Sequence, residues 1–193
     1  MLRLLALAAL LLLPSGATAE EPMLPPGERP VPVAAGFFLV NLSDVAEREE
    51  TFTADLYLSF RWYDARLAFA GTGPIRFLED AAVEKLGTMW WPQLEFVNTA
   101  APTVTNRSLE VAPDGTVRYV LGVTADFRAN LDLRRFPLDR QMLEVQIESF
   151  TWTADQMVFV PDTGRIGFNA ENTFEGLAVT AVRADIRQSD ITG

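Results

Sequence analysis

The chain has 193 residues, of which 49% are hydrophobic and 22% are charged, and its formal net charge is −10. This length suits one well-buried domain and is too short for two ordinary ones. The acidic balance makes nucleic acid an unfavourable partner, because like charges repel. The sequence has no histidine and no cysteine, which excludes a Ser-His-Asp triad, a thiol nucleophile and the usual zinc ligands. We therefore expect a protein that is not an enzyme, with no cofactor and no metal site.

The first 19 residues have the pattern of a secretory signal peptide. Arg3 precedes an apolar run from Leu4 to Leu13, and a small-residue site ends at Ala19. The alternative is a membrane anchor, but about ten apolar residues are too few to cross a bilayer, and no later segment reaches the ~20 that are needed. Residues 20–32 are rich in proline and are expected to form an extended leader without packed structure. We therefore expect an exported chain whose domain spans residues 33–193.

The domain itself is dominated by patterns that are typical of strands. Residues 33–44 read as a first strand, and residues 51–64 alternate strictly between apolar and polar side chains. The expected inward face carries Phe52, Ala54, Leu56, Leu58, Phe60 and Trp62, and the outward face carries Thr53, Asp55, Tyr57, Ser59 and Arg61. A short helix is expected at Asp80–Leu86, before Gly87.

The second half of the chain continues in strands. Residues 106–127 predict a hairpin that turns at Pro113–Gly115. Residues 142–150 alternate again, with Leu143, Val145 and Ile147 on one face, and residues 174–188 read as a last strand. This pattern predicts an all-β sandwich with one short helix. Because the last strand would leave a sheet edge open, we expect the chain to be truncated before its final strand.

One segment does not fit a strand. Residues 134–139, Arg-Arg-Phe-Pro-Leu-Asp, contain Pro137, which has no N–H to donate to a ladder. The segment therefore predicts a loop between two strands. By composition alone, an ordinary surface turn with solvated arginines explains it as well.

Four motifs resemble those of the pentameric ligand-gated ion channels. Phe136 to Gln141 is similar to the F-P-[F/L]-D-x-Q signature, and Trp62 to Leu67 is similar to W-x-D-x-R-L. Trp90 to Asn98 resembles W-x-P-D followed by asparagine, except that Gln93 replaces the aspartate, and residues 113–119 resemble the hairpin turn of the family. Animal members carry cysteines at positions that correspond to Ala129 and Leu143. Their absence, and the overall pattern from residue 31 to residue 186, resemble the bacterial proton-gated members most.

The resemblance implies a fold, an assembly and a place in the cell. The fold would be the immunoglobulin-like β-sandwich of the neurotransmitter-gated channel ligand-binding domain, and the assembly a homopentamer on the periplasmic face of a bacterial inner membrane. A membrane domain beyond residue 193 would be the second partner. The residues expected to couple agonist binding or protonation to pore opening are Phe136, Pro137, Leu138, Asp139, Glu47 and Glu50. The acidic charge favours cation conduction.

Members of this family bind small-molecule agonists between subunits, in a cage of aromatic side chains. Carried over to this sequence, the site takes Phe150 and Trp152 from one subunit, Tyr57 from its neighbour, and Glu95 near the W-x-P segment. Val97 occupies an aromatic position of that segment and offers no π face. Core packing explains Phe150 and Trp152 equally well, so the sequence does not support a strong amine cage.

The segment between the first two strands is the candidate for proton sensing. Glu47, Glu49 and Glu50 are crowded there with only Arg48 to neutralise them, and crowded carboxylates raise one another's pKa. The alternative is a solvated acidic turn. Two other functions stay open at this stage: a secreted, pentameric small-ligand-binding protein without a pore, and an enzyme that uses a pair of carboxylates.

Overall fold

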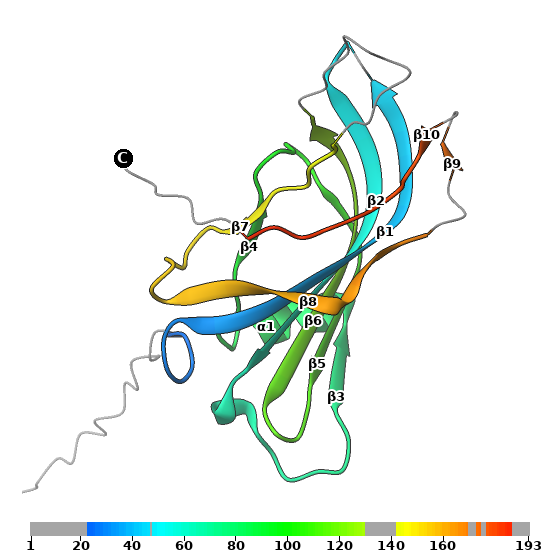
Figure 1. Cartoon of the computed structure of the whole chain (residues 1–193). Helices are drawn as coiled ribbons and strands as arrows, with labels where there is room; N and C mark the ends of the chain where they lie inside the picture. The colour runs from blue at the N-terminus through cyan, green and yellow to red at the C-terminus, as the bar shows by residue number, and fades with distance from the viewer. Residues whose placement is uncertain (1–22, 47, 130–141, 170–172, 175–176, 187–193) are drawn as a thin grey trace, which may run out of the picture.

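The structure is a computed structural model that describes residues 23–46, 48–129, 142–169, 173–174 and 177–186. Most of the described chain is strand (Figure 1). Among these residues, no helix is long and apolar enough to cross a membrane. The elements are β1 (Val31–Ala46), β2 (Thr51–Tyr63), the 3-10 helix η1 (Ala65–Leu67), β3 (Ile75–Leu78), α1 (Glu79–Leu86), β4 (Leu94–Phe96), β5 (Thr103–Val111), β6 (Thr116–Arg128), β7 (Ile147–Ser149), β8 (Met157–Phe168), β9 (Thr173–Phe174) and β10 (Leu177–Ala178).

A six-stranded sheet forms the larger layer, in the order β3-β5-β6-β2-β1-β8. The strands from β3 to β1 pair antiparallel, and β8 joins β1 in parallel at the edge. β8 was not expected from the sequence, because Pro161, Gly164 and Gly167 interrupt its pattern. An edge position tolerates Pro161, since one side of an edge strand makes no ladder bonds.

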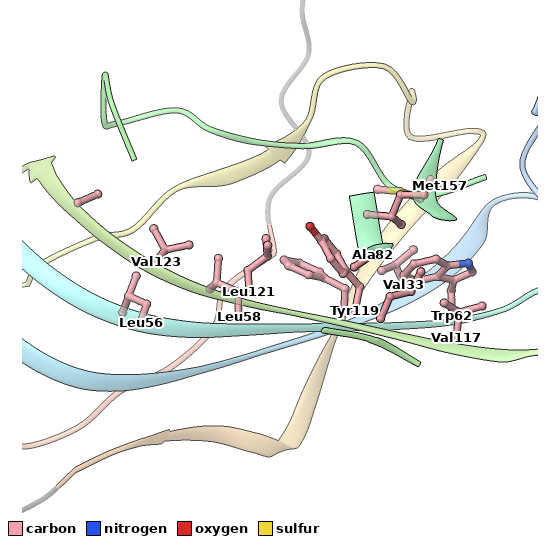
Figure 2. Packing of buried hydrophobic residues seen from close by; sticks show 14 of the residues in the cluster. Val33, Leu56, Leu58, Trp62, Ala82, Val117, Tyr119, Leu121, Val123 and Met157 are labelled. Atoms are coloured by element: carbon pink, nitrogen blue, oxygen red, sulfur yellow. The ribbon is translucent and has the colours of Figure 1, made fainter. Parts of the chain in front are cut away.

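The alternation of residues 51–64 is confirmed. All six residues of the predicted inward face are buried, whereas Tyr57 on the other face is 44% exposed. The partner strand β6 repeats the pattern, and Figure 2 shows Val117, Tyr119, Leu121 and Val123 pointing to the same side of the sheet. The core therefore lies on one face of the large sheet.

The second layer of the sandwich is small. Strands β4 and β7 pair antiparallel, and Leu94, Phe96 and Ile147 pack against the buried core. The predicted all-β sandwich is thus confirmed. The short helix is also confirmed: α1 begins one residue earlier than predicted and buries Ala82 and Leu86.

Two predicted strands are shorter in the structure. Of residues 142–150, only Ile147–Ser149 form a strand, although Leu143 and Val145 do pack against the core. The carbonyl of residue 144 and the N–H of residue 146 bond to the Asn98 side chain, which interrupts the ladder before β7. Of residues 174–188, the described part contributes only the two-residue strands β9 and β10 to a ladder.

The leader prediction was wrong for its described end. Pro25 and Pro26 are buried, and β1 begins at Val31 instead of residue 33. The guanidinium of Arg66 donates a hydrogen bond to the carbonyl oxygen of Leu24 at 3.1 Å, which attaches the leader to the sandwich. An extended segment therefore packs here because a side chain satisfies its backbone.

The W-x-D-x-R-L motif is structural. Asp64 is 1% exposed, and Arg66 donates to its two carboxylate oxygens through Nε and Nη2, each at 2.8 Å. The backbone N–H of Arg66 also donates to Asp64 Oδ1, so the carboxylate caps η1. Trp62, which the sequence placed on the inward face, is buried, and so is Trp90.

The predicted turn of the β5–β6 hairpin is confirmed as well. The Asp114 carboxylate accepts hydrogen bonds from the backbone N–H and the hydroxyl of Thr116, and these bonds hold the pKa of Asp114 below its usual value. Gly115 has a positive φ of 91°. Its carbonyl oxygen accepts from the N–H of Asp64 at 3.0 Å, so the turn and the end of β2 are joined directly.

Candidate functional site

Two glutamates stand opposite each other on the outer surface of the small layer. Glu95 of β4 and Glu148 of β7 are register partners in the antiparallel pair. Directly opposed residues point to the same face of a sheet, and their neighbours Phe96 and Ile147 pack toward the core. The two carboxylates therefore share the face that points away from the core.

An exposed aromatic ring lies next to this pair in the sequence. Phe150 follows Ser149, the last residue of β7, and is 79% exposed. Its backbone N–H donates to the carbonyl oxygen of Gln93 at 3.1 Å, and the hydroxyl of Thr151 donates to Gln93 Oε1 at 2.5 Å. Gln93, which departs from the family motif, thus fixes the turn that presents the ring.

We call Glu95, Glu148 and Phe150 the acidic–aromatic face. Two carboxylates attract a cation by charge, and the face of an aromatic ring attracts it through its quadrupole. This combination is suited to an ammonium group. Among the described residues, no group of three acidic side chains is arranged as metal ligands would be.

Trp152 packs against the core, which was one of the two roles that the sequence allowed for it. Its indole N–H donates to the carbonyl oxygen of Trp91 at 2.9 Å, and its ring centroid lies 5.9 Å from that of buried Trp90. Because the ring packs against the core, Trp152 does not belong to the acidic–aromatic face.

Tyr57 lies on the opposite side of the sandwich. It points away from the core on β2, and its hydroxyl is 3.5 Å from Nδ2 of Asn106. The acidic–aromatic face points away from the core on the other layer. One chain therefore does not bring Tyr57 and Phe150 together, and a site that uses both needs a second copy.

Part of the predicted coupling region is described. The carbonyl oxygen of Glu50 accepts a hydrogen bond from the N–H of Ala129 at 2.7 Å, and Glu49 and Glu50 are exposed. The turn between β1 and β2 thus contacts the chain immediately before residue 130. Glu47 and the predicted contact residues Phe136, Pro137, Leu138 and Asp139 lie outside the described residues.

A polar cleft of about 500 Å³ lies beside this contact. Residues from the turn, the end of β6 and the segment before β7 line it, four of them charged or polar and two apolar: Glu50, Arg128, Glu144, Gln146, Ala129 and Met142. The β1–β2 turn, which the sequence linked to coupling, therefore lies beside the two described segments that flank residues 130–141 in the chain.

Two residues of this region escaped the sequence analysis. Glu148 had a usable signal, because the alternation of Leu143, Val145 and Ile147 places it on the outer face. Asn98 was noted only as part of a motif. Its contacts join segments that are 30 and 46 residues away, and no local pattern shows them.

The sequence is similar to known receptor subunits. It is 34% identical over 137 residues to gamma-aminobutyric acid receptor subunit theta of Mus musculus. The aligned residues make up 68% of this chain and 21% of that protein. It is 35% identical over 133 residues to subunit rho-1 of Homo sapiens, with 66% and 27% covered, and 33% identical over 138 residues to subunit beta-4 of Gallus gallus, with 69% and 28% covered. The chain thus spans between 21% and 28% of the length of these relatives.

The agreement extends over most of the chain. Residues 17–181 match the family described as the neurotransmitter-gated ion-channel ligand binding domain. The sandwich, the Asp64–Arg66 motif and the β5–β6 turn lie within this range. This is a family of channel domains and not of enzymes, as the composition predicted. The chain therefore belongs to the neurotransmitter-gated ion-channel ligand-binding domain family.

Proposed function

We propose that this chain binds the ammonium group of a small molecule between two copies of itself and couples its binding to a pore. The observation that carries the proposal is the acidic–aromatic face, where Glu95 and Glu148 are register partners beside exposed Phe150. The ammonium group would lie against these three side chains. Tyr57 of a neighbouring copy would complete the site, because it faces outward from the opposite layer.

The class of ligand follows from the charge of the site. A primary ammonium carries three N–H donors and a positive charge, and the two carboxylates offer acceptors of opposite charge. Several relatives are named as gamma-aminobutyric acid receptor subunits, so gamma-aminobutyric acid is the first compound to test.

The assembly that suits this site is a closed ring of five identical copies. Contacts between two different faces of a subunit generate a ring when the rotation closes. In that ring, the turn between β1 and β2 with Glu50 and the residues Phe136 to Asp139 would contact a membrane domain beyond residue 193. The contact between Glu50 and Ala129 supports this part of the proposal.

Three finer expectations remain predictions. The sequence motifs predict a bacterial protein on the periplasmic side of the membrane that is close to the proton-gated members. The net charge predicts cation conduction. Proton sensing by Glu47, Glu49 and Glu50 rests on their crowding in the sequence. A Glu50→Gln channel whose current keeps the pH midpoint of the parent would contradict proton sensing at this turn.

The proposal predicts that both faces contribute to affinity. We expect Phe150→Ala and Tyr57→Ala each to raise the Kd for gamma-aminobutyric acid by roughly 2- to 30-fold, which is the range that a cation–π contact of 0.5–2 kcal/mol gives. Titration calorimetry on the purified ring measures this. Tyr63→Ala is the matched control, because Tyr63 is an exposed aromatic at the far end of the same strand. Equal losses in all three variants would contradict the assignment.

A further inference from the structure

Asn98 makes an unusual set of hydrogen bonds just after β4. Its side-chain Nδ2 donates to the carbonyl oxygen of Arg128 at 2.9 Å and to that of Glu144 at 2.7 Å. Its Oδ1 accepts from the backbone N–H of Gln146 at 2.9 Å. Its own carbonyl oxygen accepts from the N–H of Arg128 at 2.8 Å. One residue thus bonds to the backbone of two other segments.

These two segments flank one stretch of the chain, residues 129–143. Arg128 is the last residue of β6, and Glu144 and Gln146 come shortly before β7. Residues 129–143 lie between them in the sequence, including the motif predicted to contact the membrane domain. Because the same nitrogen binds the carbonyl oxygens of Arg128 and Glu144, Asn98 fixes the separation of the two ends.

Asn98 is also connected to the acidic–aromatic face through strands β4 and β7. Asn98 lies three positions after Glu95, and Gln146 lies two positions before Glu148. The N–H of Val97 also donates to the carbonyl oxygen of Gln146 at 3.0 Å, which continues the β4–β7 pairing up to Asn98. A movement of β4 against β7 therefore changes the geometry at Asn98 directly.

We propose that Asn98 is a positioning residue that transmits occupancy of the acidic–aromatic face to the two ends of residues 129–143. This inference rests on the proposed function, because it needs a ligand that acts on β4 and β7. Ligand contact with Glu95 and Glu148 shifts the two strands, and the Asn98 amide carries the shift to Arg128 and Glu144. The shift then reaches Ala129, whose N–H donates to the carbonyl oxygen of Glu50.

The three side-chain hydrogen bonds at position 98 require an amide. An asparagine supplies two N–H donors and a carbonyl acceptor, and all of these functions are used here. An aspartate keeps the acceptor for Gln146, loses both donors and places a negative charge against two carbonyl oxygens. An alanine loses all three side-chain bonds. The two variants therefore remove different parts of the connection.

The first arm of the test needs no ligand. Amide hydrogen exchange is measured by NMR on the full chain for the parent, Asn98→Ala and Asn98→Asp. The Gln146 amide should exchange at least tenfold faster in Asn98→Ala and should stay protected in Asn98→Asp, which keeps the acceptor. Asn106→Ala is the matched control, because the side chain of Asn106 makes a long contact on the exposed sheet face. Unchanged exchange at Gln146 in Asn98→Ala would overturn the proposal.

The second arm adds saturating gamma-aminobutyric acid. In the parent chain we expect binding to change the exchange rate at Ala129 by at least threefold. Both Asn98 variants should bind within about threefold of the parent Kd and should lose this response. A residue that only stabilised the fold would leave the response of the bound protein intact, so a persistent response at Ala129 would overturn the proposal. If the parent binds no amine, the proposed function fails and transmission fails with it, while the first arm still decides whether Asn98 holds the two ends.

Discussion

Gly115→Ala is expected to lower the free energy of unfolding by at least about 3 kcal/mol, which is a fall in melting temperature of roughly 6–12 °C for a chain of this size. Two causes add up. The positive φ of 91° is unfavourable for alanine, and an added Cβ would lie 2.5 Å from the carbonyl oxygen of Asp64. Because that oxygen belongs to the backbone beside a buried carboxylate, it has little room to move. Thermal unfolding followed by circular dichroism measures the change.

Two other glycines separate these causes. Gly27 also has a positive φ, of 67°, but an added Cβ there meets no described atom within 4 Å, so Gly27→Ala should carry only the conformational cost of about 1–2 kcal/mol. Gly73→Ala has neither problem and should be nearly neutral. A Gly115→Ala protein that melts at the temperature of Gly27→Ala would contradict the close contact between the hairpin turn and Asp64.

Neutralising the two opposed glutamates is expected to weaken binding and to strengthen the fold. Glu95→Gln and Glu148→Gln should each raise the Kd for gamma-aminobutyric acid about tenfold, because each removes a charge-assisted contact worth about 1.5 kcal/mol. The ligand-free domain should become more stable by a few tenths of a kcal/mol, since like charges directly opposite on a sheet repel. Calorimetric titration and thermal unfolding of the same samples measure both effects.

Glu110→Gln is the control for this pair. Glu110 lies on β5 and pairs with Arg76 at 2.8 Å, so its neutralisation removes an attraction instead of a repulsion. It should leave the Kd unchanged and should not raise stability. If Glu148→Gln lowered stability without a change in Kd, the pair would have a structural role and the proposed amine site would be wrong.

The sequence predicted the four central strands of the large sheet, β5, β6, β2 and β1, because their signal is local, and it did not predict the two edge strands β3 and β8. The alternation in β2 and β6 follows from burial of one face, and the β5–β6 turn follows from the chemistry of Pro113, Asp114 and Gly115. The second layer was harder to predict. The carbonyl of Glu144 and the N–H of Gln146 bond to the side chain of Asn98, a residue more than forty positions away, and a period of two predicts a strand there whether or not a partner strand exists.

The candidate site was predicted only in part, because some of its contacts join residues that are far apart in the sequence. Phe150 and Tyr57 were found through the resemblance and are exposed as a ligand site requires. Trp152 was assigned with them, but a hydrogen bond and a ring contact with neighbouring tryptophans place it against the core. Glu148 was missed because its partner Glu95 lies 53 positions earlier in the chain, and only the strand register shows that the two are opposed.

The most direct test of a site between copies is a mixing experiment with two defective variants. Phe150→Ala and Tyr57→Ala damage opposite faces of the chain. In rings assembled from an equal mixture, about a quarter of the interfaces should join an intact Phe150 face to an intact Tyr57 face. We therefore expect calorimetric titration of the mixed rings to recover high-affinity binding of gamma-aminobutyric acid at about a quarter of the sites, although neither variant binds tightly alone. Mixed rings with no high-affinity sites would contradict a ligand site that is shared between two copies.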